Sequence, residues 1–216
     1  MKKIILIIMS FLILIPYAYA EEKQSNLLAP NAKSAILIEV STGEILYEHN
    51  SHEKLAPASM TKMMSLVIIM EAIEKGSIKY TDMITVSANA SGMGGSQILL
   101  EEGEQMSVDD VLKGITIASG NDAVVAMAET IAGSEANFVK MMNEKVKALG
   151  LKDTYFQNSH GLDATNHYSS AHDMAIIARE LVKHEKILEY SSIYETYLRT
   201  GTTRQTWLVN TNKVVC

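Results

Sequence analysis

One stretch of the sequence is apolar on nearly every face of the helix that it predicts. Residues 59–75 read SMTKMMSLVIIMEAIEK, and Gly76 follows where a helix terminator is expected. A helix that is apolar all round is stable in water only when neighbouring elements cover each of its faces. The segment therefore predicts a central buried helix, and the remaining residues must supply the layers that enclose it.

Strand-forming segments lie near both ends of the chain. Residues 35–40 and 44–47 read as short strands, and Ser41-Thr42-Gly43 between them predicts a hairpin. Residues 194–215 are rich in Tyr, Thr, Trp and Val, which favour strands. Helical patterns lie between these segments, at about residues 107–118, 122–132, 135–149 and 170–183. This order predicts a mixed α/β fold in which one sheet joins the two ends of the chain.

Charge and side-chain chemistry limit the function. The formal net charge of the 216 residues is −6, whereas proteins that bind nucleic acid need basic patches. The histidines form no His-Glu-x-x-His pattern of the kind found in zinc hydrolases. Cys216 is the only cysteine, so the fold must rest on its apolar core rather than on an intramolecular disulfide.

The start of the chain has the pattern of an export signal. Lys2 and Lys3 form a basic start, residues 4–15 are a nearly unbroken apolar run, and an Ala-x-Ala cleavage site occupies residues 18–20. The run is too short to span a membrane comfortably. We therefore expect residues 1–20 to be a signal peptide, with an uncleaved N-terminal anchor as the alternative. The mature chain is then expected in the cell envelope, outside the cytoplasmic membrane.

Ser59 and Lys62 lie three residues apart where the buried helix begins. This spacing places both side chains on one helix face, where the hydroxyl and the amine can meet. Burial favours the neutral amine, which can remove the serine proton and so make the hydroxyl a nucleophile. A plain helix cap and a solvated lysine are the alternatives, and residues 51–54 show the same spacing in a polar, loop-like stretch.

Residues 119–121 form a second motif, Ser-Gly-Asn, between two predicted helices. A side chain in such a loop can point into a cleft. Ser119 can relay a proton to a leaving group, and Asn121 can orient both the lysine and a substrate amide. The alternative is that Asn121 or Asp122 caps the next helix, and residues 87–89 match the same pattern.

Five segments, two of which contain the motifs above, match one family and occur in the order that the family has. The matching segments are residues 57–64 (PASMTKMM), 96–97 (SQ), 117–123 (IASGNDA), 158–162 (NSHGL) and 167–173 (HYSSAHD). Together they resemble the low-molecular-mass penicillin-binding proteins, the serine-type D-Ala-D-Ala carboxypeptidases, over most of the mature chain. The resemblance implies a β-lactamase/transpeptidase-like fold. Residues 21–216 would then form the catalytic domain, with a helical subdomain inserted at about residues 77–165.

The resemblance also implies roles for the residues of the two motifs. Ser59 would attack the carbonyl between the two terminal D-alanines of a peptidoglycan stem peptide, and Lys62 would accept the serine proton. Ser119 and Asn121 would help to pass a proton to the departing D-alanine, with Asn121 binding the substrate. Water would hydrolyse the acyl-serine, and β-lactam antibiotics would acylate the same Ser59. The resemblance implies no metal and no other cofactor.

A third family motif, Lys-Thr-Gly, has no clear counterpart in the chain. The only match is Arg199-Thr200-Gly201, which lies upstream of residues 207–213 (WLVNTNK), whereas the family's motif lies downstream of such a segment. We expect that the chain is cut off at Cys216, with the C-terminal part of the sheet incomplete and the family's membrane-binding helix absent. In the family, the backbone of the strand that carries this motif supplies part of the oxyanion hole. Impaired activity is therefore expected, because loss of an oxyanion-hole donor costs about 100- to 1000-fold in rate.

Two other classes of function stay open. A non-catalytic envelope protein could bind stem peptides without turnover; the intact Ser59, Lys62, Ser119 and Asn121 count against this class, and the absent third motif counts for it. A related Ser-x-x-Lys hydrolase, such as a β-lactamase or an esterase, would share the first motif. β-Lactamases usually carry Asp where Gly120 stands, and turnover of a β-lactam would identify that class.

Overall fold

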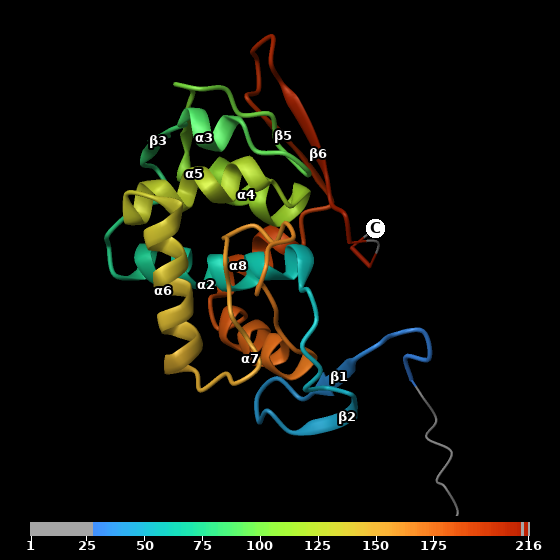
Figure 1. Ribbon diagram of the computed structural model, residues 1–216. Helices are drawn as coiled ribbons and strands as arrows, with labels where there is room; N and C mark the ends of the chain where they lie inside the picture. The colour runs from blue at the N-terminus through green and yellow to red at the C-terminus, as the bar shows by residue number, and fades with distance from the viewer. Residues whose placement is uncertain (1–27, 213, 216) are drawn as a thin grey trace, which may run out of the picture. The chain divides into compact units, whose positions relative to one another are not determined.

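The computed structural model describes residues 28–212, 214 and 215. The chain divides into two units, residues 1–32 and residues 33–216. In the first unit, the described residues contain a turn in which the Ala32 N–H donates to the Ala29 carbonyl oxygen. The expected signal peptide, residues 1–20, lies outside the described residues. The second unit carries the helices and strands that follow (Figure 1).

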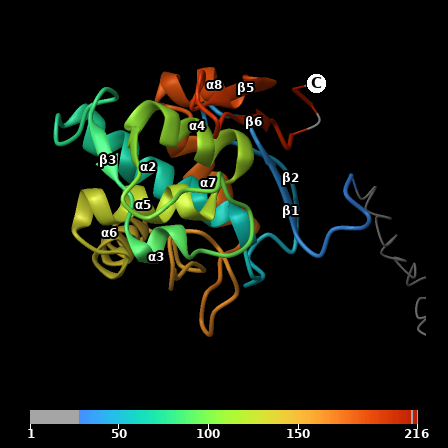
Figure 2. The same ribbon diagram turned by 90° about the horizontal axis from the view of Figure 1, so that it is seen from above.

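The helices surround one central member, which is the helix that the sequence predicts to be buried. They are α2 (Thr61–Glu74), α3 (Ala88–Ser91), α4 (Val108–Ala118), α5 (Asn121–Ala132), α6 (Glu135–Ala148), α7 (Ala171–Leu181) and α8 (Glu185–Ser191). Helices α5, α6 and α7 pack against α2, which is buried along most of its length (Figures 1 and 2). None of the helices that the structure describes has the length and apolar character that a membrane crossing requires.

Serine side chains fix where three of these helices begin. The hydroxyls of Ser107, Ser134 and Ser170 each accept a hydrogen bond from the backbone N–H three residues further on, at the start of α4, α6 and α7. The predicted starts of these helices are therefore confirmed. Helix α2 begins slightly later than predicted, because Ala58–Met60 form a separate 3₁₀ turn, η1, in front of it.

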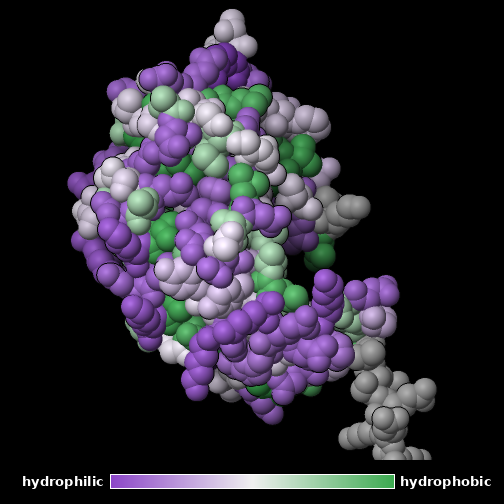
Figure 3. Space-filling view, viewed as in Figure 1, coloured by the Kyte–Doolittle hydropathy of each residue, from purple (hydrophilic) through white to green (hydrophobic). Residues whose placement is uncertain are grey.

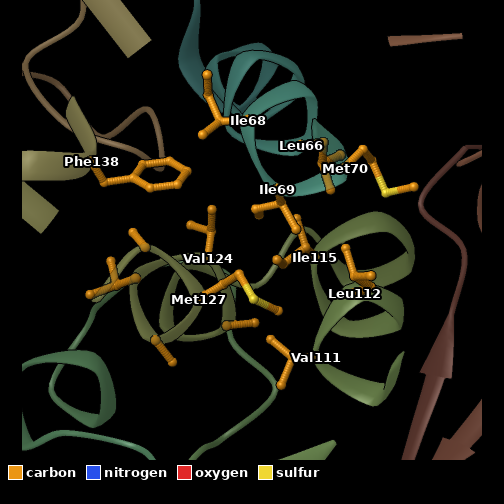
Figure 4. Packing of buried hydrophobic residues seen from close by; sticks show 14 of the residues in the cluster. Leu66, Ile68, Ile69, Met70, Val111, Leu112, Ile115, Val124, Met127 and Phe138 are labelled. Carbon is orange, nitrogen blue, oxygen red and sulfur yellow. The ribbon is translucent and has the colours of Figure 1, made fainter. Parts of the chain in front are cut away.

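The core lies where α2, α4, α5 and α6 meet. Phe138 of α6 and Ile69 of α2 converge on Val124 and Met127 of α5, and all four side chains are fully buried (Figure 4). Ile115 of α4 closes the same cluster. The face that Figure 3 shows is mainly hydrophilic, with smaller hydrophobic patches. Most apolar residues of α2 are thus buried, and Met63 and Ile73 are partly buried against the same core. Burial of this kind is the main favourable term in folding.

The strands pair in three separate antiparallel ladders within the described residues. They are β1 (Ala35–Ile38) with β2 (Ile45–His49), β3 (Met83–Thr85) with β4 (Gln105–Ser107), and β5 (Glu195–Leu198) with β6 (Thr206–Val209). The predicted N-terminal hairpin and the predicted strands in the tail are confirmed. The short strands β3 and β4 were not predicted.

The mixed α/β class is confirmed, but the single sheet joining both ends of the chain differs from the structure. No ladder connects β1 and β2 to β5 and β6 among the described residues. Strand β1 packs against α7, whereas β6 packs against α4, and Figure 1 shows the two hairpins well apart. Ladder pairing needs neighbouring strands about 4.8 Å apart, and the two hairpins are not brought that close.

Candidate active site

Ser59 lies in turn η1, directly before α2, and the backbone around it is strained. Ala58 has a φ of 47°, in the left-handed region that residues other than glycine rarely adopt. Gly161 packs against the same turn, and a Cβ atom added to Gly161 would lie 1.9 Å from the Ala58 carbonyl oxygen. Strain of this kind persists where the surrounding structure enforces it, and it is commonest at functional sites. Tertiary packing therefore sets the position of Ser59.

The amine of Lys62 lies between the Ser59 hydroxyl and a backbone carbonyl. Lys62 Nζ is 3.2 Å from Ser59 Oγ and donates to the His160 carbonyl oxygen at 2.8 Å. Lys62 is only 4% exposed, so it is not the solvated lysine of the alternative interpretation. Ser59 is not a helix cap either, because no side chain caps η1 or α2. The structure thus brings the hydroxyl and the amine together.

The electrostatic setting of the amine favours its neutral form. Burial lowers the pKa of Lys62 from 10.5 to about 8, and the carboxylate of Asp122 partly opposes this change. With this pKa, about one amine in ten is neutral at pH 7, compared with fewer than one in a thousand for an ordinary lysine. Lys62 can therefore act as a proton acceptor near neutral pH.

Asp122 fastens the loop that faces the start of α5. Its carboxylate accepts hydrogen bonds from the backbone N–H groups of Ile98 and Leu100, each at 3.0 Å, and Asp122 is 1% exposed. The same carboxylate accepts from the Ala123 N–H at 2.8 Å. These bonds satisfy the buried carboxylate and hold the loop of residues 98–100 beside the second motif.

Asn121 is held in place but keeps a free acceptor. Its Nδ2 group donates to the Gly94 carbonyl oxygen at 2.8 Å, and its backbone N–H donates to the Ser96 carbonyl oxygen at 2.7 Å. Asn121 does not cap α5, because the N-cap is Gly120. Its Oδ1 atom is buried without a hydrogen-bond partner in the described part of the chain. An unpaired buried acceptor is costly, so it suits a site that a ligand completes.

Ser119 occupies a sharp turn between α4 and α5. It has φ 56° and ψ 34°, a left-handed conformation that ends α4. Within residues 28–212, 214 and 215, the Ser119 hydroxyl forms no hydrogen bond, and no hydrogen bond links Ser119 or Asn121 to the amine of Lys62. Ser59 and Lys62 are therefore within hydrogen-bond distance of each other, and the polar groups of the second motif form no hydrogen bond with that pair in the described part of the chain.

The competing sequence matches have structural roles of their own. Ser51 donates to Glu48 at 2.6 Å, and Lys54 is half-exposed and pairs with Asp153 at 3.7 Å. Ser87 is the N-cap of α3 and accepts a hydrogen bond from the Ala90 N–H. Neither match brings a serine to a buried amine.

Arg199 belongs to a different part of the molecule. Its guanidinium pairs with Glu104 and donates to the Ile98 carbonyl oxygen at 3.1 Å and to Thr206 Oγ1 at 2.9 Å. These contacts tie the turn between β5 and β6 to the loop before β4. They agree with the prediction that residues 199–201 are not the third motif.

His167 lies in one of the family segments, residues 167–173, and the sequence motifs indicate no role for it, whereas the structure places it against Thr61. The Gln157 N–H donates to His167 Nδ1 at 3.0 Å, so the His167 Nε2 atom carries the proton and donates to Thr61 Oγ1, 2.8 Å away. Burial lowers the pKa of His167, which favours this neutral form. The first residue of α2 is thereby anchored. No group of three or more metal-binding side chains occurs among the described residues.

Solved structures define the class of protein first. Penicillin-binding protein 5 from Haemophilus influenzae is 36% identical with a TM-score of 0.79, and the match covers 85% of this chain and 53% of that one. Penicillin-binding protein 6B from Escherichia coli is also 36% identical with a TM-score of 0.79, and the match covers 85% of this chain and 59% of that one. The fold is therefore that of the penicillin-binding proteins, as the sequence resemblance predicted.

Sequence comparison narrows the class to one family. The D-alanyl-D-alanine carboxypeptidase family matches residues 20–216, and the chain belongs to it. DacF of Bacillus subtilis, a D-alanyl-D-alanine carboxypeptidase, is 57% identical over 202 residues, which are 93% of this chain and 52% of that protein. DacC of Escherichia coli is 41% identical over 82% of this chain and 45% of that protein. The chain spans about half the length of the curated relatives it matches.

Proposed function

We propose that the chain forms the catalytic region of a serine-type D-alanyl-D-alanine carboxypeptidase, which removes the terminal D-alanine from peptidoglycan stem peptides. The observation that carries the proposal is the 3.2 Å contact between Lys62 Nζ and Ser59 Oγ at a buried amine. The family supplies the substrate class, because relatives such as DacF and DacC are named for this activity.

The first half of the reaction transfers the acyl group to Ser59. A neutral Lys62 amine accepts the serine proton while Oγ bonds to the carbonyl carbon of the penultimate D-alanine. The His160 carbonyl oxygen, 2.8 Å from Nζ, keeps the amine directed at the hydroxyl. The N-terminal end of α2 places the positive end of its dipole near the negative charge that develops. The peptide C–N bond then breaks, and the proton passes to the departing amine.

The second motif is assigned to substrate binding and proton relay. The Ser119 hydroxyl, which has no hydrogen-bond partner among the described residues, lies between α4 and α5 and can pass the proton from Lys62 to the leaving nitrogen. Asn121 Oδ1, buried and unpaired in the described part of the chain, can accept a hydrogen bond from a peptide N–H of the substrate. Water then hydrolyses the acyl-serine and restores both groups. No metal or other cofactor forms part of the proposal.

The substrate also defines where the protein acts. Peptidoglycan lies in the cell envelope outside the cytoplasmic membrane, so residues 1–20 are proposed as the export signal and residues 21–216 as the catalytic domain. Residues of about 77–165 are proposed as its helical subdomain. β-Lactams are proposed as inhibitors that acylate Ser59, since the related solved structures are penicillin-binding proteins.

Replacement of Ser59 by alanine is expected to abolish penicillin attachment and D-alanine release. Attachment is measured by mass spectrometry of the intact chain and its peptides. Release from a peptide ending in D-Ala-D-Ala is measured in a chimera that joins this chain, up to the end of its match with DacF, to the part of DacF after the matched region, because the chain spans half of that relative. Ser51→Ala, at the other match to the motif, is the control and is expected to retain both.

The outcomes separate the candidate functions. An adduct on a residue other than Ser59, or D-alanine release by the Ser59→Ala chimera, rejects the proposal. Stable attachment to Ser59 without D-alanine release identifies a non-catalytic binding protein. Rapid turnover of the β-lactam identifies a β-lactamase instead.

Acylation of Ser59 is expected to speed up as the pH rises, with a midpoint near the Lys62 pKa of about 8. Below the midpoint the amine is protonated, so the rate falls about tenfold for each pH unit. Burial lowers the pKa of His160 from 6.5, with Glu135 opposing and Lys62 adding to this change, so the titration of His160 lies on the acid side of the Lys62 midpoint. Initial rates of labelling with a fluorescent penicillin between about pH 6 and pH 9 measure the midpoint.

Asp122→Asn tests the direction of this effect. Its carboxylate raises the pKa of Lys62, so the substitution is expected to move the midpoint to lower pH. A labelling rate that does not change with pH over the same range would contradict a role for Lys62 as the base.

A further inference from the structure

The segment of Ser159 and His160 is held from one side by the helix that carries the nucleophile. Ser65 Oγ donates to the Ser159 carbonyl oxygen at 2.6 Å, and Lys62 Nζ donates to the His160 carbonyl oxygen at 2.8 Å. Lys62 and Ser65 lie three residues apart on one face of α2, so two successive side chains meet two successive carbonyl groups. The direction of the Lys62 amine therefore depends on where this segment lies.

Helix α6 holds the same segment from the other side through one side chain. Glu135 Oε1 accepts hydrogen bonds from the Ser159 backbone N–H at 2.9 Å and from Ser159 Oγ at 2.7 Å. The Leu162 N–H donates to His160 Nδ1 at 3.1 Å, so the neutral ring carries its proton on Nε2, which lies 3.5 Å from Glu135 Oε1. Two donors of Ser159 thus bond to one carboxylate oxygen, and the His160 ring nitrogen lies near the same atom.

Glu135 is not needed to cap its own helix. The N-cap of α6 is Ser134, whose side chain accepts from the Asn137 N–H at 3.2 Å. The hydrogen bonds that Glu135 makes among the described residues go to Ser159, which is completely buried. The geometry therefore relates the carboxylate to the segment opposite Lys62 rather than to local helix stability.

We infer that Glu135 is a positioning residue for the Ser59–Lys62 pair, acting through the backbone of Ser159 and His160. By fixing the His160 carbonyl oxygen, it holds the Lys62 amine in line with the Ser59 hydroxyl. The inference rests on the proposed function, because it assigns this alignment to acylation. A misplacement of about 1 Å at reacting groups costs about a hundredfold in rate, so loss of the carboxylate should slow acylation rather than penicillin binding.

The test compares Glu135→Ala with Glu135→Gln in the 216-residue chain. Glutamine keeps an oxygen acceptor for Ser159, so it should stay within about threefold of the original rate constant for acylation. Alanine removes the acceptor and should lower that rate constant at least tenfold, towards the roughly hundredfold cost of misplaced reacting groups. The penicillin dissociation constant should stay within about twofold. Quenched reactions at several penicillin concentrations give the acylation rate constant and the dissociation constant separately.

Glu129→Ala is the matched control. Glu129 also clamps a loop, since it accepts from Ser87 Oγ at 2.5 Å and from Asn89 Nδ2 at 2.8 Å, but it makes no contact with residues 159–160. The Glu129→Ala variant should be less stable than the original chain but should keep the same rate constant for acylation. If Glu135→Ala does not fold, Ser159→Ala takes its place. It removes one of the two hydrogen bonds and should slow acylation by at least about threefold.

A second measurement does not depend on acylation. In the folded chain labelled with ¹³C-lysine, the two Cε protons of Lys62 should give separate signals because the amine is fixed, and Lys62→Arg identifies them. The signals should merge in Glu135→Ala, or in Ser159→Ala if that variant replaces it, and stay separate in Glu135→Gln. Two results overturn the inference. One is that Glu135→Ala, or Ser159→Ala in its place, keeps separate signals and an unchanged rate constant for acylation. The other is that Glu135→Gln acylates as slowly as Glu135→Ala. Failure of Ser59 to acylate in both the 216-residue chain and the chimera with DacF rejects the proposed function, while the lysine signals still decide the role of Glu135.

Discussion

Substitution of Lys62 by methionine is expected to slow acylation of Ser59 by roughly a thousandfold. Without the amine only water can take the serine proton, and loss of a positioned general base typically costs about 10²- to 10⁴-fold in rate. Methionine fills the space of a side chain that is 4% exposed and brings no charge. The measurement is the rate constant for labelling of Ser59 with a fluorescent penicillin at about pH 8, near the midpoint for the original chain.

Stability and charge provide the controls for this substitution. Burial lowers the pKa of Lys62 from 10.5 to about 8, so the cost of burying its charge is fully present below pH 8 and disappears as the pH rises through 10.5. Methionine relieves this cost, which offsets the lost hydrogen bond to His160, so the free energy of unfolding near neutral pH should not fall. Lys62→Arg keeps a charge that cannot be lost and should label as slowly as methionine. An arginine variant as fast as the original chain contradicts proton transfer to Lys62.

The Ser59–Lys62 pair could be anticipated because it is local. Both residues lie at one helix start, so their spacing sets their relative direction, and the apolar residues that follow indicate burial. The His160 carbonyl oxygen, which accepts the other hydrogen bond of the Lys62 amine, could not be predicted in this way. His160 lies 98 residues further along and contributes a backbone carbonyl, which leaves no mark in the side-chain pattern. The contact of Glu135 with Ser159 is hidden from sequence reasoning because the two residues lie 24 apart in the sequence and only the fold brings them together.

Strand pairing shows the same limit at the level of the fold. Strands β1 and β2 follow each other through a short turn, so their hairpin could be predicted from local residues. Whether they join β5 and β6 depends on which helices the two hairpins pack against, and α7 and α4 are far apart in the sequence. Ser119 was correctly placed between two helices, but its left-handed φ of 56° is set by the turn into α5 and not by the serine itself.

Gly161→Ala is expected to damage both the site and the fold. The added Cβ atom would lie 1.9 Å from the Ala58 carbonyl oxygen and 2.4 Å from the carbonyl carbon, which are backbone atoms that cannot rotate away. The φ of +94° at Gly161 is also one that alanine rarely adopts. Either η1 or the backbone beside His160 must move, and a shift of about 1 Å at reacting groups costs about a hundredfold in rate. Penicillin labelling of Ser59 should fall by at least that factor.

Gly150→Ala separates backbone strain from this clash. Gly150 has a φ of +70° after the end of α6, and a Cβ atom added there meets nothing within 4 Å. Its alanine variant should lose about 1–2 kcal/mol of stability from the left-handed conformation alone and should label Ser59 normally. The measurements are urea unfolding and the extent of Ser59 labelling per folded molecule, made on both variants. Gly161→Ala should lose more stability than Gly150→Ala and also most of its Ser59 labelling. Equal labelling by the two folded variants would show that the contact between Gly161 and Ala58 does not position the nucleophile.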